Sequence, residues 1–405
     1  MDELVTAEFG ERRRRIARDM QRRMVAHIAA GGTTDFAPCP MENDAAAYTD
    51  PARAELERRE IFLKLPLLAG LSQDIPARGD CLLFEELGHS VVLVRGQDGL
   101  LRAFRNMCMH RASKLVRAGE GGVCERRTRL TCPFHAWTFH LDGSLAGVPG
   151  KPGFEGIELG RRNLLPVAVA EWHGCIFLRL TGDGPLDIRS FLGPFAPELA
   201  QLELAAARPL RSSAVRAETN WKYAVDTYAE GYHFGALHAS TIGTTHISNV
   251  AVYDAFGPHW RINFPEKSLG SLVGRPESEW PEPDYGGIHF LFPNAVLVIG
   301  SVEAGKGFAR IFRIFPGPTV GTMCCRVTVY APGGEISSEY RAGFDNDNCD
   351  DVVTREDYSV ATEGYANLVS APAGFRVIYG RNEIAVQSFH RHVSERIGLG
   401  ERGRV

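Results

Sequence analysis

The first residues with evident metal chemistry are two cysteine–histidine pairs. Cys108 and His110 form one pair, and Cys132 and His135 form another after 21 intervening residues. Two thiolates and two imidazoles suit a tetrahedral zinc ion, and they also suit a [2Fe–2S] cluster in which two cysteines hold one iron and two histidines hold the other. Zinc fingers pair cysteine with cysteine, whereas here each loop supplies one residue of each type. Two such loops can clamp a two-iron cluster from opposite sides, so the pattern favours the cluster.

A second candidate metal site lies in the segment from Asn220 to His238, which contains His233 and His238. On an ideal helix this separation turns the two side chains apart by more than a quarter turn, but Gly235 can break the helix and let the rings converge. With one carboxylate they would form a facial triad, which binds Fe(II) on one side and leaves the other side for O2. The spacing alone also admits two unrelated histidines.

The sequence around both sites resembles that of the Rieske non-haem iron oxygenases, in particular the catalytic alpha subunits of the aromatic-ring-hydroxylating dioxygenase family. The pattern C-x-H … C-P-F-H-A-W-T-F is similar to the Rieske signature. The segment with N-W-K, Asp226 and Glu230-x-Tyr-His is similar to the family's iron-binding helix. Respiratory Rieske proteins carry a further cysteine in each loop, and this chain does not. The interval between the loops, which includes Cys124, is longer than the family pattern. We interpret it as an insertion and do not expect Cys124 to be a ligand.

The resemblance implies a role for each of these residues. The cluster ligands are then Cys108, His110, Cys132 and His135, and two iron ligands are His233 and His238. Glu230 would share a helix face with His233 and is expected to carry electrons between subunits, with Asp226 and Asn220 as further catalytic residues of this segment. Most aromatic-ring members have Asp at the position of Glu230. Glu is similar to what some quaternary-ammonium mono-oxygenases show.

The third iron ligand is sought among the acidic residues of 345–357. In the family this ligand is commonly the second acid of a pair that opens an apolar helix, which favours Asp357, directly after Glu356. Asp351 is the next candidate, and the other acids are expected to be solvated. His390 and His392 also lie in a segment whose sequence resembles the family, but we expect structural or surface roles for them.

The predicted elements divide the chain into three parts. Apolar residues recur at helical spacing over 8–30, which predicts a docking helix, and a linker with glycines and prolines follows it. A short helix is predicted at 52–62 and strands at 81–85, 90–95, 101–104, 166–170 and 175–180. Beyond these, helices are predicted at 221–238, 351–368 and 384–397, and strands at 289–298, 308–315 and 324–330.

The expected fold class is therefore α+β. A helical arm and linker occupy residues 1–49, and an all-β Rieske [2Fe–2S] domain occupies 50–185. A catalytic α+β domain over 186–405, with an antiparallel sheet flanked by helices, holds the mononuclear iron.

Composition excludes several classes of function. Charged residues make up 23% of the chain and the formal net charge is −4, so no basic field favours nucleic acid or an anionic membrane. Nine scattered cysteines do not indicate a secreted disulfide framework. With no long apolar run and no signal-peptide order at the N-terminus, we expect a cytoplasmic protein.

The resemblance implies the oxygenase component of a multicomponent enzyme that uses O2 at non-haem Fe(II). Because the chain has no dinucleotide fingerprint and no ferredoxin-type cysteine run, electrons from NAD(P)H are expected through a separate reductase, with or without a ferredoxin. The family also implies a homotrimer, with or without a small beta subunit. A small aromatic substrate is favoured over a non-aromatic methylated one such as a quaternary ammonium compound, and residues in 228–234, 253–264 and 289–292 are expected to line the pocket. A Rieske electron carrier and a zinc-stabilised binding protein are the other readings of the motifs.

Overall fold

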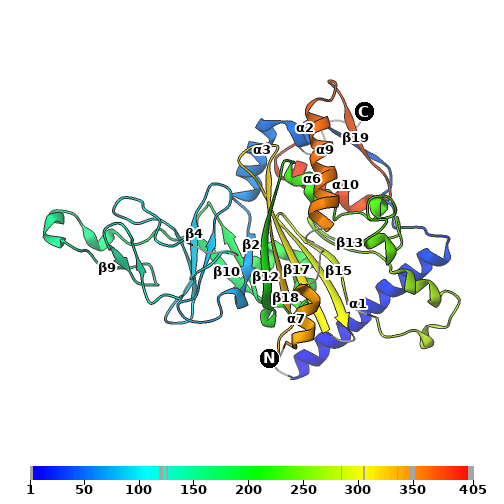
Figure 1. Cartoon of the computed structure of the whole chain (residues 1–405), viewed down its shortest axis with the longest axis horizontal. Coiled ribbons are helices and arrows are strands. Elements are labelled where there is room, and N and C mark those ends of the chain that lie inside the picture. The colour runs from blue at the N-terminus through cyan, green and yellow to red at the C-terminus, as the bar shows by residue number, and fades with distance from the viewer. Residues whose placement is uncertain are drawn as a thin grey trace.

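The computed structural model describes residues 3–117, 122–124, 126–283, 285–303, 306–334, 336–345 and 352–399. A β-rich part contains β4, β9 and β10, and a larger part is built on one long sheet with helices around it (Figure 1). The predicted α+β class with antiparallel sheets is confirmed. None of the helices in these ranges combines the length and apolar character needed to cross a membrane.

The β-rich part consists of three small antiparallel sheets. One has the order β5-β4-β3-β6, from Leu101–Arg105, Val91–Arg95, Cys81–Phe84 and Val123–Cys124. The second has the order β10-β11-β2, from Ala168–Trp172, Cys175–Arg179 and Leu67–Leu71. The third has the order β7-β8-β9, from Leu130–Thr131, Thr138–Phe139 and Leu145–Gly147. Every residue of β3 and β4 is buried, so these two strands form the core against which the cluster loops pack.

The long sheet has seven antiparallel strands in the order β12-β18-β17-β16-β15-β14-β13. These strands are Arg208–Ala217, Met323–Ala331, Lys306–Pro316, Ala295–Glu303, Gly287–Leu291, His259–Asn263 and Val252–Phe256. The prediction of one strand over 289–298 is wrong, because β15 and β16 are separate strands that pair with each other. Pro293 lies in the turn between them, and proline cannot donate to a sheet ladder.

Helices pack on both faces of this sheet, because strand side chains alternate between the two faces. Phe290 and Phe312 pack in one cluster with residues of α6 (Trp221–Asp226), α9 (Tyr358–Val369) and α10 (Ile384–Arg396). Their neighbours Leu291 and Ile311 pack in a second cluster with residues of α1 (Glu3–Ala29), α4 (Ile188–Leu192) and α5 (Ala196–Gln201). The other α-helices of the described residues are α2 (Ala46–Thr49), α3 (Pro51–Glu57) and α7 (Ser338–Asp345), and β1 (Met41–Asp44) pairs with β19 (Arg376–Tyr379).

The N-terminal helix confirms the prediction of a docking arm. Ala17 and Met20 are buried against the sheet. Several arginines of this helix form ion pairs with other elements; Arg23, for example, binds Asp35 and Asp254. Figure 1 shows α1 as a long diagonal helix beside the larger part of the molecule.

The segment that leads to the two histidines is less helical than predicted. α6 ends at Asp226, and residues 232–235 form only a 3-10 turn. The predicted helix over 221–238 is therefore wrong, and Glu230 and His233 do not share a helix face. A Cβ on Gly231 would lie 2.8 Å from the Phe264 ring, so the chain approaches its neighbour here more closely than other residues allow.

Candidate metal centres

His233, His238 and Asp357 converge on one point in the larger part of the molecule. One ligand atom from each lies within 4.8 Å of the others, and across the described ranges this is the one such group of three or more histidine, cysteine or acidic residues. The Nε2 atoms of His233 and His238 are 3.5 and 3.4 Å from Asp357 Oδ1. His238 and Asp357 are 1% and 4% exposed. Two imidazoles and one carboxylate in a buried site are the donor set of a facial triad.

Each imidazole ring also contacts a further carboxylate through its other nitrogen, Nδ1. His233 Nδ1 is 2.5 Å from Glu230 Oε1, and His238 Nδ1 is 2.5 Å from Glu356 Oε2. Carboxylates that bind Nδ1 fix the ring and its tautomer, which leaves Nε2 free to bind a metal. His233 Nε2 is in fact buried without a hydrogen-bond partner, which is the state expected of a metal ligand.

The charges around this site favour a cation. Burial lowers the pKa of His233, but the carboxylates of Asp357 and Glu230 beside its two ring nitrogens outweigh burial and raise that pKa to about 9. Burial opposes ionisation of Asp357, yet the contacts with both histidines lower its pKa. Three carboxylates around two imidazoles leave an excess of negative charge, which a divalent metal ion neutralises.

The geometry of residues 353–357 brings two adjacent acids to one ring. These residues form a π-helical turn that runs directly into α9, and such turns are frequent at functional sites. Glu356 contacts Nδ1 and Asp357 faces Nε2 of His238. Sequence reasoning missed Glu356, although its place beside the predicted ligand was a usable signal. Asp351, the alternative ligand, lies outside the described residues.

Asp226 and Asn220 do not join the three converging residues. Asn220 caps α6, where its Oδ1 accepts from Lys222 N at 3.0 Å, and it also donates to the Tyr48 carbonyl. Asp226 accepts from Tyr48 Oη at 2.6 Å and from His390 Nε2 at 2.9 Å. His390 is fully buried and has the structural role that the sequence predicted. His392 contacts the Ser388 carbonyl of its own helix.

The four candidate cluster ligands lie on two loops with the same backbone conformation. Ala112 N donates to Cys108 O and Ala136 N donates to Cys132 O, at 2.9 and 3.0 Å. Both alanines adopt left-handed φ angles, +58° and +56°. Each loop therefore makes the same reversal four residues after its cysteine, and its histidine lies between the cysteine and the reversal.

Side chains of the two loops are in contact with each other. The ring centres of His110 and His135 are 4.8 Å apart, and His110 stacks on Trp137 at 5.0 Å. Burial raises the pKa of the Cys108 thiol, which interacts with the Cys132 thiol. His110 Nδ1 is buried without a partner, and His135 is exposed. Paired thiols, paired imidazoles and an unsatisfied ring nitrogen fit a cluster held by both loops.

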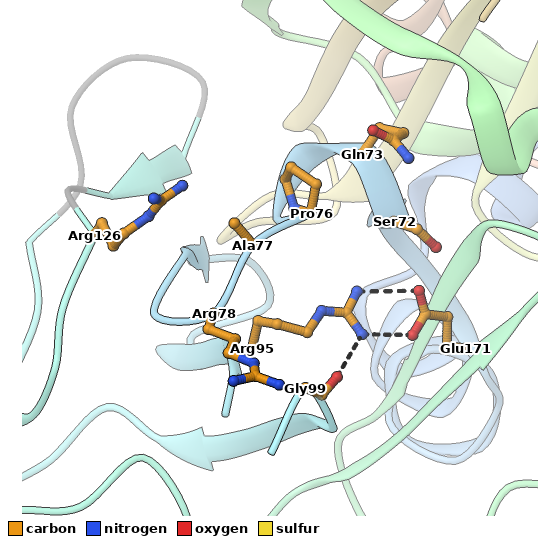
Figure 2. Close-up of a pocket in the computed structure, with 9 residues that line it drawn as sticks. All are labelled: Ser72, Gln73, Pro76, Ala77, Arg78, Arg95, Gly99, Arg126 and Glu171. Carbon is orange, nitrogen blue, oxygen red and sulfur yellow. Dashed lines mark hydrogen bonds and ion pairs between the residues drawn. The ribbon is translucent and has the colours of Figure 1, made fainter. Parts of the chain in front are cut away.

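A large cleft in the β-rich part is a separate feature. It has a volume of about 690 Å³ and is lined by Ser72, Gln73, Pro76, Ala77, Arg78, Arg95, Gly99, Arg126 and Glu171. Figure 2 shows that Arg95 and Glu171 form a two-pronged ion pair inside it, with distances of 2.7 and 3.0 Å. None of the seven candidate metal ligands lines this cleft, so it is not the site of the metal chemistry.

The fold and the two donor sets define the class as an iron–sulfur domain joined to a mononuclear-iron domain. Residues 66–164 match the family of the Rieske [2Fe-2S] domain, and residues 204–399 match the ring hydroxylating alpha subunit (catalytic domain). The carnitine monooxygenase oxygenase subunit of Acinetobacter baumannii is 33% identical over 276 residues, which cover 66% of this chain and 70% of that protein. The chain belongs to the family of Rieske oxygenase alpha subunits.

Other relatives match a smaller share of this chain. The glycine betaine monooxygenase oxygenase subunit of Chromohalobacter salexigens is 34% identical over 197 residues, 49% of this chain and 43% of that protein. The chain thus spans about half the length of several curated relatives that it matches. Among solved structures, the quaternary ammonium Rieske monooxygenase CntA with L-carnitine superposes with a TM-score of 0.73 at 21% identity, covering 89% of this chain and 96% of that one. Naphthalene 1,2-dioxygenase from Rhodococcus sp. gives 0.67 at 17% identity, covering 95% and 99%. These two structures share the fold.

Proposed function

We propose that this chain is the oxygenase component of a multicomponent Rieske oxygenase. Electrons from NAD(P)H enter through a separate reductase, with or without a ferredoxin, and O2 oxidises a small organic substrate. The observation that carries the proposal is the convergence of His233, His238 and Asp357 in a chain that also presents two matched Cys–His loops. A Rieske electron carrier would need only the β-rich part.

The proposed ligands follow from the two donor sets. Cys108, His110, Cys132 and His135 hold the [2Fe–2S] cluster, and His233, His238 and Asp357 hold iron. When bound, that iron supplies the centre at which O2 is reduced and activated. Glu230 and Glu356 hold the two Nδ1 positions, so that both Nε2 atoms face the metal. The division into residues 1–49, 50–185 and 186–405 remains part of this proposal.

Glu230 is proposed to link the two centres of adjacent subunits in a homotrimer. Its carboxylate contacts His233 Nδ1, while His135 of the cluster site is exposed and can reach another chain. Asp226 and Asn220 then act through the position of α6 rather than by contact with the metal.

For the substrate, we propose a small quaternary ammonium compound that undergoes mono-oxygenation. The sequence pattern favoured an aromatic substrate, but the relatives named above are carnitine and glycine betaine monooxygenase subunits, and Glu230 agrees with them. Phe234 lies beside both iron-site histidines, with ring centres 5.0 and 5.8 Å away, and packs on Phe264 at 4.9 Å. Aromatic faces attract quaternary ammonium groups.

Ring dihydroxylation of an aromatic substrate is the second candidate. It is supported by the biphenyl dioxygenase alpha subunit of Paraburkholderia xenovorans, which is 28% identical over 222 residues. Turnover of trimethylammonium carboxylates but not of biphenyl or naphthalene, with the cognate reductase supplied, would select the first candidate. The reverse preference would select the second.

The decisive experiment combines metal analysis with EPR spectroscopy of the anaerobically reduced protein. We expect about three irons and two sulfides per chain, the inventory of one two-iron cluster and one mononuclear iron. Zinc without sulfide would contradict the proposal. With both metals loaded to full occupancy, Glu230→Gln should slow re-oxidation of the cluster in a single turnover. Glu363→Gln, an exposed site on α9, is the matched control, and equal rates in the two variants would refute the bridge.

A further inference from the structure

Two cysteines outside the cluster face each other across neighbouring strands. Cys81 of β3 and Cys124 of β6 are direct partners in the antiparallel register. Directly opposed residues have Cα atoms about 4.5 or 5.5 Å apart, and disulfides span Cα separations of about 4.4–6.8 Å. Both thiols are free, and the charge of a Cys124 thiolate would be felt by the Cys81 thiol.

The neighbouring contacts hold β6 in this register. Arg126 Nε donates to Asp80 Oδ1 at 2.8 Å, and Arg127 N donates to Gly79 O at 2.8 Å. At the other end of β6, a Cβ on Gly122 would lie 2.9 Å from Leu83 O. The two strands are therefore in close contact on both sides of the cysteine pair.

The two thiols differ in their access to solvent. Cys81 is fully buried and Cys124 is partly exposed, so a small oxidant meets Cys124 first. Burial raises the pKa of Cys81 to about 12 and that of Cys124 to about 11. Because the thiolate is the reactive form, we expect oxidation to be slow at neutral pH and faster in alkaline solution.

We propose that Cys81 and Cys124 are a modification site that a peroxide converts to a cross-strand disulfide. The Cys124 sulfur attacks one oxygen of H2O2, the O–O bond breaks, and a sulfenic acid and one water form. The Cys81 sulfur then displaces the hydroxyl of the sulfenic acid, which leaves as a second water with the Cys81 proton. Two thiols lose two electrons in total, and one peroxide is reduced to two waters.

The disulfide would join the interval between the two cluster loops to a core strand. Opposed Cβ atoms about 4.5–5.5 Å apart must approach to about 3.5–4.5 Å, so the closed form is strained and a thiol reductant should reopen it. The interval that carries Cys124 is the one that departs from the family pattern, and the dithiol gives it a chemical function of its own.

The test uses cluster-loaded enzyme treated with hydrogen peroxide at mildly alkaline pH, then alkylated and digested without reduction. We expect a peptide that links Cys81 to Cys124, lower in mass than its two parts by two hydrogen atoms and released by dithiothreitol. Cys175→Ser, which removes a lone buried thiol of β11, should leave the linked peptide unchanged. Cys124→Ser should abolish it.

Peptide mapping separates this bond from a Cys108–Cys132 bond, which the interacting cluster thiols could form if the cluster were lost. The proposal fails if Cys124 oxidises to sulfinic acid while Cys81 stays alkylated. It also fails if Cys108–Cys132 is the first linked pair, or if no linked peptide forms while the cluster remains intact. Because only the partly exposed Cys124 needs to be replaced, a folding defect at buried Cys81 does not affect the result.

Discussion

The two proposed metal centres are built in opposite ways. The cluster site consists of two short loops, each with a cysteine and a histidine close together in sequence and each reversing at a left-handed alanine. The iron site draws on segments separated by 118 residues, as in the contact between His238 and Glu356. The cluster loops leave His135 exposed, whereas the iron site is enclosed and each imidazole has a carboxylate behind it. A local motif suffices for the first site, and only a folded domain assembles the second.

The sharpest way to break this comparison is to remove one ligand from each centre. Asp357→Asn should lose the mononuclear iron but keep the cluster, and Cys132→Ser should do the reverse. For Asp357→Asn we expect product formation to fall by more than the roughly 10–100-fold that loss of an outer partner costs. Iron and sulfide counts with EPR measure both inventories. Loss of both centres in either variant would show that they do not fold independently.

A smaller effect should follow from loss of the carboxylate behind an imidazole. Glu356→Gln leaves the three proposed ligands in place but weakens the hold on His238 Nδ1, so iron affinity or turnover should fall by about 10–100-fold. The comparison is with Glu363→Gln on the exposed face of α9, which should behave as wild type. Titration of the apo site with iron compares the affinities of the two variants. Equal affinities would show that Glu356 does not support iron binding.

Asp226 tests whether a residue of the same segment can matter without touching the metal. Asp226→Asn removes the charged acceptor between Tyr48 and His390, so the free energy of unfolding should fall by about 1–3 kcal/mol. Both metals should remain bound. Urea unfolding and metal analysis of the same sample check this, and loss of iron at unchanged stability would assign Asp226 to the metal site after all.

The smallest expected effect concerns the symmetry of the cluster loops. A left-handed conformation costs an L-residue about 1–2 kcal/mol, while glycine costs about 0.5–1 kcal/mol in backbone entropy. Ala112→Gly and Ala136→Gly should therefore each stabilise the protein slightly, by less than about 1 kcal/mol, and by similar amounts. Thermal unfolding of the two variants measures the difference. Opposite signs would mean that the loops are not equivalent.

Much of the fold follows from residue patterns. The predicted strands at 81–85, 90–95 and 101–104 agree with β3, β4 and β5 to within a residue, because strongly apolar runs between turn residues have few alternatives. The strands β12, β13 and β14 were not predicted. β12 alternates exposed and partly buried residues along one edge of the sheet, and its partner β18 lies more than a hundred residues away in sequence.

The sequence by itself determined the two Cys–His pairs, the pair His233 and His238, and the resemblance of the surrounding segments to the family. Ligand type and local spacing are properties of the chain. Only the tertiary structure decided that Asp357 lies beside both histidines and that Glu356 contacts Nδ1 of His238. It also showed that Asp226 faces Tyr48 and His390 instead, and that Cys124 faces Cys81. The physical reason is the same in each case. These contacts join residues that are not neighbours along the chain, and the pairing of strands and the packing of helices on sheets set their distances, which no local pattern encodes.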